Sequence, residues 1–177
     1  MLVVKQIDLP KIIALSQWER IILTLITTCL LPLFVHALPF FSGANVGQQW
    51  LPIFYAPLIA ALCFRPHVSL LAALCAPTIN HFLFGIPPES MARLLTFELV
   101  VFNTIVILLQ RRALFKCWQI IPAYLVTLFF ALLMLGPVPV PGIGNALLRS
   151  LTVSWPGLIA LTLLAEIARR FFSSENA

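Results

Sequence analysis

The chain has 177 residues, of which 61% are hydrophobic and only 10% are charged, and its formal net charge is +5. A soluble domain carries about 25% charged residues, so these charges are too few to cover a water-exposed surface. The composition excludes a water-soluble globular protein and predicts an all-α integral membrane protein with a single membrane domain, 1–177. It also excludes nucleic acid as a partner, because the basic residues lie at the ends of apolar segments, where they orient membrane proteins in the lipid bilayer.

The N-terminal region does not resemble a secretory signal, because charges are scattered through it and no apolar run ends at a small-residue cleavage site. It predicts instead a short interfacial helix that lies on the membrane with Ile12, Ile13 and Leu15 facing lipid. Pro10 fits the first turn of such a helix, where no backbone N–H is needed.

Six apolar segments follow, each bounded by charges, prolines or glycines, and together they predict a bundle of six membrane-spanning helices. A spanning helix needs about 20 residues, with about 17–25 usual. The second segment is the shortest, and it is expected to borrow residues from the Gly-Gln-Gln before it. The predicted spans are 20–38, 50–64, 67–84, 91–110, 117–136 and 150–168.

The basic residues predict the orientation of this bundle. With an even number of spans both termini lie on one side, and that side holds nine of the eleven lysines and arginines, leaving Arg93 and Arg149 on the other. Because cytoplasmic loops carry the basic excess, both termini are predicted to be cytoplasmic, in a multi-pass protein of the cell inner (cytoplasmic) membrane. The outer loops are rich in proline and glycine, which suits a lid or a mouth.

Polar residues interrupt the predicted spans. Glu98 is the eighth residue of the fourth span, roughly 10 Å below its start. A charge near the bilayer centre costs roughly 2.5–3.5 kcal/mol, so Glu98 is either a ligand contact or a helix-packing group. Asn80 and His81 lie one turn from the outer end of the third span, where they either line an outward cavity or bond a neighbouring helix. Asn103 belongs to a different helical face from Glu98 and is expected to pack.

Further candidates lie on the other spans. Trp50, Trp155 and Tyr124 could stack on a flat ligand; the alternatives are the aromatic belt for Trp50 and core packing for the other two. Arg93 either anchors a helix end in headgroups or attracts an anionic ligand. Thr24 and Thr28 are four residues apart on the first span, a spacing that lets another helix approach closely and makes them candidates for coupling to a partner protein.

Several chemistries are absent from the sequence. It has no GxxxxGK[ST] phosphate loop, so the chain is not expected to hydrolyse ATP itself. It has no HExxH or GxSxG motif and no CxxC among its four cysteines, so we predict no metal, cofactor or catalytic residue. Glu166 is expected to form only a surface ion pair with Arg169. Six spans with polar residues suited to ligand binding at their outer end, and no motif for ATP hydrolysis, suggest a binding subunit that needs partner proteins.

The order of several degenerate motifs then resembles one family. The chain reads "LPIFYAPLIAALCFRP" from Leu51, "LLAALCAPTINHFLFGIPP" from Leu70, "FELVVFNTIVILLQRR" from Phe97 and "WPGLIALTLLAEIARR" from Trp155. This pattern is similar to the substrate-binding (S) component of energy-coupling factor (ECF) transporters, the vitamin importers of prokaryotes. Alanine, leucine or cysteine replaces the family's glycines in spans two and three, and Thr24 and Thr28 stand where the family usually has alanines.

The resemblance implies a mechanism. The S component captures a vitamin or its precursor in an outward-facing pocket, associates with a transmembrane coupling subunit and two ATPase subunits, and topples in the membrane to release the ligand inside. It implies that Asn80, His81 and Glu98 line or support the pocket, and that the first outer loop, around Gly47 to Trp50, is its lid.

Two other functions remain open from the residues. The chain could be a non-transport scaffold or assembly protein, whose intramembrane polar residues only hold helices together. It could also be a small intramembrane enzyme that uses Glu98 and His81 as acid and base. A binding subunit would bind a small ligand saturably, a scaffold would tolerate changes at these residues, and an enzyme would turn a substrate over by itself.

Overall fold

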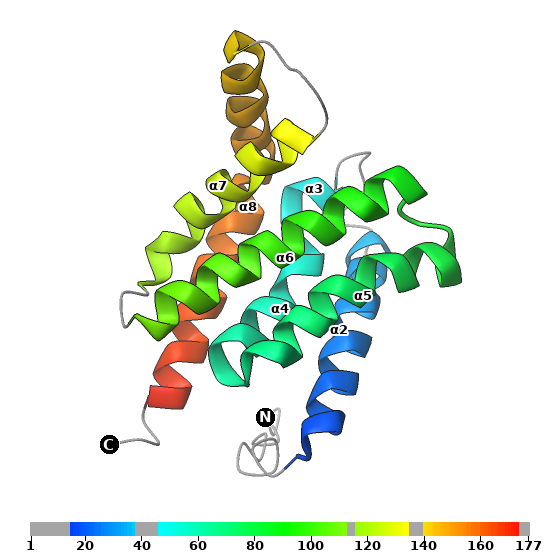
Figure 1. Cartoon of the computed structure of the whole chain (residues 1–177), viewed down its shortest axis with the longest axis vertical. Coiled ribbons are helices and arrows are strands. Elements are labelled where there is room, and N and C mark those ends of the chain that lie inside the picture. The colour runs from blue at the N-terminus through cyan, green and yellow to red at the C-terminus, as the bar shows by residue number, and fades with distance from the viewer. Residues whose placement is uncertain (1–14, 38–45, 113–115, 135–139, 174–177) are drawn as a thin grey trace, which may run out of the picture.

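A computed structural model describes residues 15–37, 46–112, 116–134 and 140–173 of the chain. Helices make up nearly all of these ranges, and the described part holds no strand (Figure 1). The predicted interfacial helix before residue 15 lies outside the described residues. The elements are α2 (Gln17–Ala37), α3 (Val46–Trp50), α4 (Pro52–Cys63), α5 (Pro66–Phe84), α6 (Glu89–Arg111), the 3-10 helix η2 (Cys117–Gln119), α7 (Ile120–Met134) and α8 (Val140–Ser173).

Six segments of the described chain are long and apolar enough to cross a membrane. The prediction of an all-α, multi-pass membrane protein is therefore confirmed. As expected, the second span reaches back over Gly-Gln-Gln and covers Val46–Cys63, with α3 and α4 as its two parts. The other segments are Gln17–Ala37, Pro66–Phe84, Glu89–Arg111, Cys117–Met134 and Gly142–Phe171.

The last helix is the largest departure from the sequence prediction. The proline- and glycine-rich stretch 137–145 was expected to be an irregular outer loop, but α8 is helical from Val140 onward. Pro141 occupies the first turn, where a helix needs no N–H, and the helix also continues through Pro156. At 1.5 Å per residue its 34 residues extend about 50 Å, and its first turns rise beyond the other helices in Figure 1.

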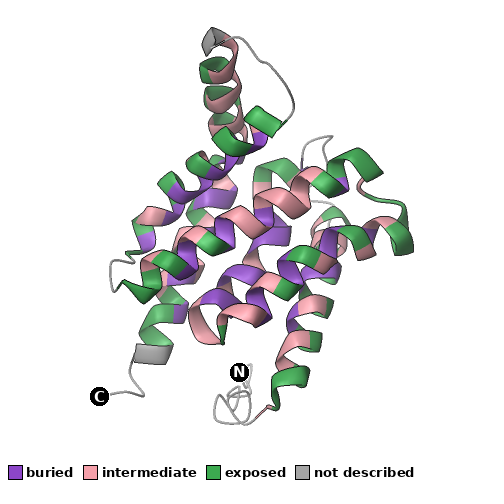
Figure 2. Cartoon of the chain, in the orientation of Figure 1, coloured by how far each residue is buried: buried purple, intermediate pink, exposed green. Residues whose placement is uncertain are grey.

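Helix α4 is the centre of the bundle. It packs against α2, α5, α6 and α8, and most of its side chains are buried (Figure 2). Phe54 meets the rings of Phe102 and Tyr124 edge to face, with centroids 5.3 and 5.8 Å apart. This geometry adds about 0.5–1.5 kcal/mol per pair to the burial of the rings.

Polar groups also join helices inside the bundle. The hydroxyl of Ser69 lies 2.8 Å from the carbonyl oxygen of Pro57 and 3.0 Å from Oδ1 of Asn103, while Nδ2 of Asn103 donates to the carbonyl of Leu99 at 2.7 Å. These contacts connect α4, α5 and α6 at a point where all three helices are buried. The expectation that Asn103 has a packing role is confirmed.

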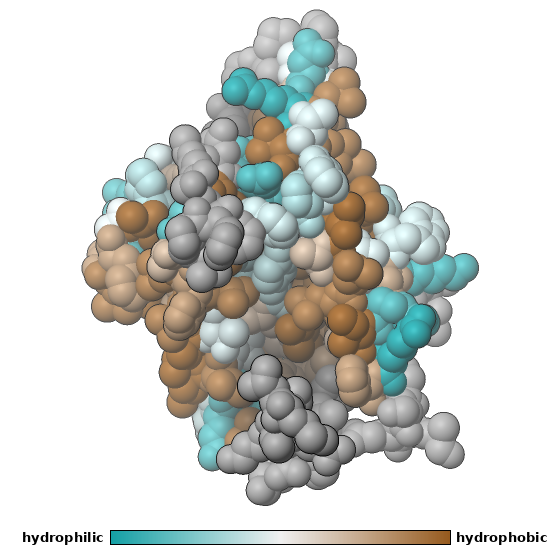
Figure 3. All heavy atoms as spheres, turned by 180° about the vertical axis from the view of Figure 1, so that it is seen from behind, coloured by the Kyte–Doolittle hydropathy of each residue, from teal (hydrophilic) through white to brown (hydrophobic). Residues whose placement is uncertain are grey.

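The outer surface is apolar, as lipid contact requires. Figure 3 shows broad apolar areas on the back of the molecule. Large hydrophobic side chains that point outward come from every long helix. They include Trp18, Phe34, Phe82, Leu108, Phe130 and Phe171.

Candidate functional site

The turn between α5 and α6 gives His81 a clear structural role. Gly85 ends α5 in the left-handed region, with φ of 68°, and its N–H donates to the carbonyl of His81 at 2.9 Å. Nδ1 of the same histidine lies 2.9 Å from the carbonyl oxygen of Pro87. Because a carbonyl only accepts, the ring nitrogen is the donor. His81 therefore holds the Gly-Ile-Pro-Pro turn in place through both its backbone and its ring.

Asn80 continues the buried face of α5 and is only 4% exposed. Its Oδ1 is fully buried and has no hydrogen-bond partner within the described part of the chain. A buried amide oxygen without a donor costs about 1–3 kcal/mol. Among the described residues, two buried side-chain polar atoms lack a hydrogen-bond partner, and Oδ1 of Asn80 is one of them.

Arg93 lies away from this buried face. It forms an ion pair with Glu89, one turn earlier on α6, and the two side chains are 77% and 65% exposed. An exposed ion pair of this spacing contributes little to stability. Arg93 therefore lies on the surface near the start of α6.

A second group of polar residues lies deeper, where α6, α7 and α8 meet under α3. Ser154 of α8 is fully buried, and its hydroxyl donates to the carbonyl of Gln48 at 2.9 Å. The hydroxyl of Tyr124, from α7, lies 3.3 Å from the same Ser154 oxygen. Ser154 has only one proton and Gln48 takes it, so the Tyr124 hydroxyl is the donor to Ser154.

Glu98 of α6 is half-buried, and its carboxyl group lies within electrostatic range of Tyr124 without a hydrogen bond to it. No residue in the described ranges donates a hydrogen bond to it, and the nearby Tyr124 proton is directed to Ser154. The carboxyl group of Glu98 therefore keeps its acceptor capacity inside the bundle.

Helix α3 covers this group from one side. The Tyr55 hydroxyl of α4 donates to the carbonyl of Trp50. Against α8, a Cβ added at Gly157 would lie 2.7 Å from the backbone of Trp50, so only glycine allows this approach. Between α3 and α4, Leu51 adopts a φ of 51°, a left-handed conformation that is unusual for a bulky residue. Thus α3 is a separate short helix, fixed to both α4 and α8. We call Glu98, Tyr124, Ser154 and the α3 backbone above them the α3 cluster.

The structure therefore separates the predicted site residues into groups. Glu98 and Trp50 belong to the α3 cluster, while Asn80, His81 and Arg93 lie along the α5–α6 turn. No contact between described residues joins His81 to Glu98. Trp155 follows Ser154 in the chain, but its side chain is 58% exposed and points away from the buried core.

Tyr55 and Ser154 were not predicted as site residues. A single serine in an apolar run, one residue before Trp-Pro-Gly, was the available signal for Ser154. The signal was weak because a lone hydroxyl often bonds only its own helix, as Thr162 does with Leu158 here. The partner of Ser154 is 106 positions away in the chain, so only the fold reveals it.

Thr24 and Thr28, the predicted candidates for coupling to a partner, lie on the side of α2 that packs within the chain. Both are buried, and α2 packs against α4 and α5 of the same chain. Their hydroxyls donate to Arg20 and Thr24 carbonyls one turn back, which leaves a smooth face for close packing. The helices that approach this face belong to the chain itself, so a partner would have to contact α2 on its exposed side.

Near the end of α8, Glu166 forms ion pairs with Arg169 and Arg170 at 3.3 and 2.6 Å, and the thiol of Cys117, in η2 just before α7, donates to it at 2.9 Å. The expected pair with Arg169 is confirmed, with Arg170 and Cys117 as additional partners. Across the described residues, no three His, Cys, Asp or Glu side chains come together in a way that could hold a metal ion.

Comparisons with models of protein families, with curated proteins and with solved structures find no match to this chain. Its function must therefore be argued from its own residues and their geometry.

Proposed function

We propose that the chain is the membrane-embedded, substrate-binding subunit of an ECF-type importer, which captures a vitamin or a related small molecule from the outer side of the cytoplasmic membrane. The observation that carries this proposal is the carboxyl group of Glu98, which lies half-buried in a membrane-spanning segment, within electrostatic range of Tyr124, and has no hydrogen-bond donor among the described residues. The S-component resemblance of the sequence adds to it.

The chemistry of the α3 cluster supports ligand binding. An ionisable group inside a membrane span is costly and usually functional, and buried polar atoms normally have partners. Glu98 can accept hydrogen bonds, while Tyr124 and Ser154 hold a fixed hydroxyl arrangement within electrostatic range of it. Such a group suits a ligand that presents N–H or O–H donors.

Helix α3 would serve as the lid. A short helix that interrupts a membrane span near polar residues is a common way to build a substrate site in transporters. Two hydrogen bonds attach the α3 backbone to its neighbours, at Gln48 and Trp50, and both come from side chains of other helices. Displacing α3 would release the Ser154 hydroxyl from Gln48 and make it available to a ligand.

Transport would require other proteins. The sequence has no ATP-binding loop, so a transmembrane coupling subunit and two ATPase subunits would drive uptake. We place the ends of α2 and α8 that carry Arg20, Arg169 and Arg170 in the cytoplasm, because basic residues gather there. The exposed apolar side of α2, which includes Trp18, Ile22 and Ile26, is the face left for a coupling subunit.

Thermal unfolding of the purified chain, measured with a panel of vitamins and their precursors, tests the proposal. A ligand at about 1,000 times its Kd stabilises the protein by about 4 kcal/mol. We expect one selective increase in the unfolding temperature, lost in Glu98→Gln and kept in Glu19→Gln. The control makes the same chemical change at the start of α2, where Glu19 bonds the backbone of Ser16.

A broad panel without any selective shift would contradict the importer proposal and favour the scaffold function. If Glu98→Gln shows the same shift as the wild type, the chain binds a ligand, but not at the α3 cluster. Product formation by the chain alone would instead favour the enzyme.

A further inference from the structure

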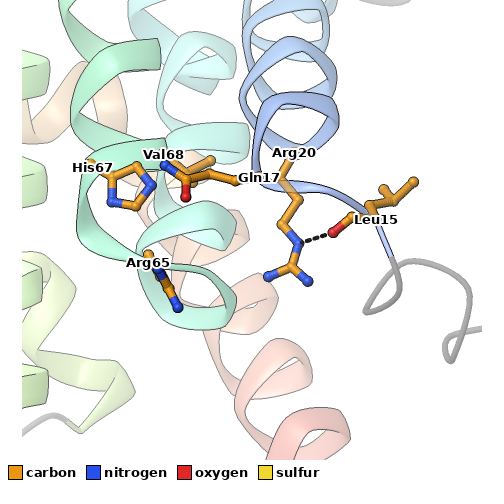
Figure 4. Close-up of a pocket in the computed structure, with 6 residues that line it drawn as sticks. All are labelled: Leu15, Gln17, Arg20, Arg65, His67 and Val68. Carbon is orange, nitrogen blue, oxygen red and sulfur yellow. Dashed lines mark hydrogen bonds between the residues drawn. The ribbon is translucent and has the colours of Figure 1, made fainter.

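A pocket lies at the opposite end of the bundle from α3, between the starts of α2 and α5. Its volume is about 180 Å³. One buried water needs roughly 10–15 Å³ of such volume, so the pocket has room for a group of several heavy atoms. Figure 4 shows that residues from the start of α2 face residues from the start of α5 across it. The pocket is lined by Leu15, Gln17, Arg20, Arg65, His67 and Val68.

Among the described residues that line the pocket are two arginines and no carboxylate, so this lining is positively charged. Arg20 and Arg65 contribute two guanidinium groups from different helices. Helix α5 begins at Pro66, with no side-chain cap and no acidic residue in its first turn. The N-terminal end of a helix carries a partial positive charge, so it adds to the two arginines. Glu19, next to Arg20 in the chain, accepts a hydrogen bond from the backbone of Ser16 at 2.6 Å and is not part of the lining.

A buried group in this pocket lacks its partner. Nε2 of His67 is fully buried and has no hydrogen-bond partner within the described residues. Such an atom costs stability unless something else satisfies it. His67 is the second residue of α5, so its ring belongs to the same helix start that carries the partial positive charge. A rotation of the ring toward the pocket would let this nitrogen donate a hydrogen bond to a ligand oxygen.

Arg20 is already held in place beside the pocket. Its Nε donates to the carbonyl of Leu15 at 3.0 Å, as the dashed line in Figure 4 shows. Its guanidinium also lies over the ring of Phe64, with 5.4 Å to the ring centroid. A side chain already held by such contacts loses little further conformational freedom when it binds a ligand.

From this geometry we infer that the pocket binds a phosphate group, carried by an anionic phospholipid or free in solution. Planar guanidinium groups match phosphate oxygens in pairs, and a helix start presents its backbone N–H groups to anions. Basic pockets at the ends of membrane helices commonly hold lipid headgroups. The inference is independent of the ligand at the α3 cluster, because none of the pocket residues belongs to that cluster.

The test compares two sources of phosphate. Thermal unfolding of the full chain is measured with inorganic phosphate against chloride at equal ionic strength, and in micelles with phosphatidylglycerol against a phosphate-free glycolipid. The test variant is Arg65→Gln, since Arg65 is exposed and makes no hydrogen bond or ion pair with other described residues. The control is Arg149→Gln, an exposed arginine at the other end of the bundle.

We expect phosphate or phosphatidylglycerol to raise the unfolding temperature of the wild type and of Arg149→Gln. In Arg65→Gln, the concentration of phosphate or phosphatidylglycerol needed for half of this shift should rise about tenfold. The loss of one hydrogen bond to a charged group weakens binding by about this factor. For Arg65→Lys, the concentration at half of the shift should lie between the values for the wild type and for Arg65→Gln. A shift with the lipid alone identifies a headgroup as the source, and a shift with inorganic phosphate identifies a site for the free ion. Absence of both shifts, or the same shift in Arg65→Gln as in Arg149→Gln, would overturn the inference.

Discussion

Gly157 sets the distance between α3 and α8. A Cβ at this position would lie 2.7 Å from the carbonyl carbon and oxygen of Trp50 and 2.8 Å from the carbonyl oxygen of Gln49. Backbone atoms cannot move aside as a flexible side chain can. The glycine therefore allows the contact through which Ser154, one turn earlier on the same helix, reaches the carbonyl of Gln48.

We expect Gly157→Ala to destabilise the protein by about 1–3 kcal/mol, because α3 must shift away from α8. The matched control is Gly144→Ala on the same helix, where an added Cβ has no neighbour within 4 Å. Alanine has a higher helix propensity than glycine by about 1 kcal/mol, so the control should be neutral or slightly stabilising. Thermal unfolding in detergent measures both. Equal unfolding temperatures for the two variants would show that α3 does not pack on Gly157.

Contacts between individual residues were the hardest feature to predict from the sequence. It identified Glu98 from its depth in an apolar run, because a charge is conspicuous there. It did not pair Glu98 with Tyr124 and Ser154, since those residues come from three helices. It also could not assign Thr24 and Thr28 to contacts within the chain, because small polar residues at this spacing suit an internal and an external helix equally well.

At the scale of whole elements, α3 and α4 form one span with a break in it. Leu51 is buried and left-handed between them, and the N–H of Leu51 donates to Gly47 while its carbonyl accepts from Phe54. The chain thus passes from α3 to α4 with both the N–H and the carbonyl of Leu51 hydrogen-bonded. Leucine gives no sequence signal for such a break, since glycine or asparagine is the usual residue with positive φ.

The Tyr55 hydroxyl bonds the last carbonyl of α3, so Tyr55→Phe should loosen this helix while keeping the core filled. The loss is expected to be about 1 kcal/mol, as for a single hydrogen bond. Hydrogen exchange followed by mass spectrometry should show faster exchange of the amides of α3. Amides in the middle of α6 serve as the internal reference. If exchange in α3 stays at the wild-type rate, the hydrogen bond does not hold the lid.

The lengths of the other helices were easier to predict. Apolar runs of 18 to 23 residues are bounded by Arg65-Pro66, by Pro87-Pro88 and by Arg111-Arg112, and the structure ends or begins helices close to these points. Helix α8 is the exception. Prolines and glycines usually indicate a loop, but one proline in the first turn and isolated glycines are compatible with a helix.

At the scale of the whole molecule, the positions of charged residues predict its direction in the membrane. The starts of α2 and α5 and the ends of α6 and α8 carry most of the described arginines, and these four points lie toward one end of the bundle in Figure 1. The other end carries Arg93 and Arg149. The positive-inside rule then predicts that the α3 cluster lies nearer the outer surface.

Cysteine labelling tests this direction. We expect Arg149→Cys to react with a membrane-impermeant maleimide in intact cells, and Arg170→Cys to react only after the cells are opened. Both arginines are exposed on α8, so the pair is matched in helix and in exposure. The wild-type chain, whose four cysteines are buried or half-buried, provides the background. The reverse pattern would place the α3 cluster near the cytoplasm and contradict capture from outside.

The central claim is that the α3 cluster binds a small molecule through Glu98. Equilibrium dialysis of the purified chain, with the compound that raises its unfolding temperature most, measures this directly. We predict saturable binding with one ligand per chain, and an increase in Kd of at least about tenfold in Glu98→Gln, the cost of one hydrogen bond to a charged group. Glu19→Gln should retain the wild-type Kd. Binding that does not saturate, or that has the same Kd in Glu98→Gln, would contradict the claim.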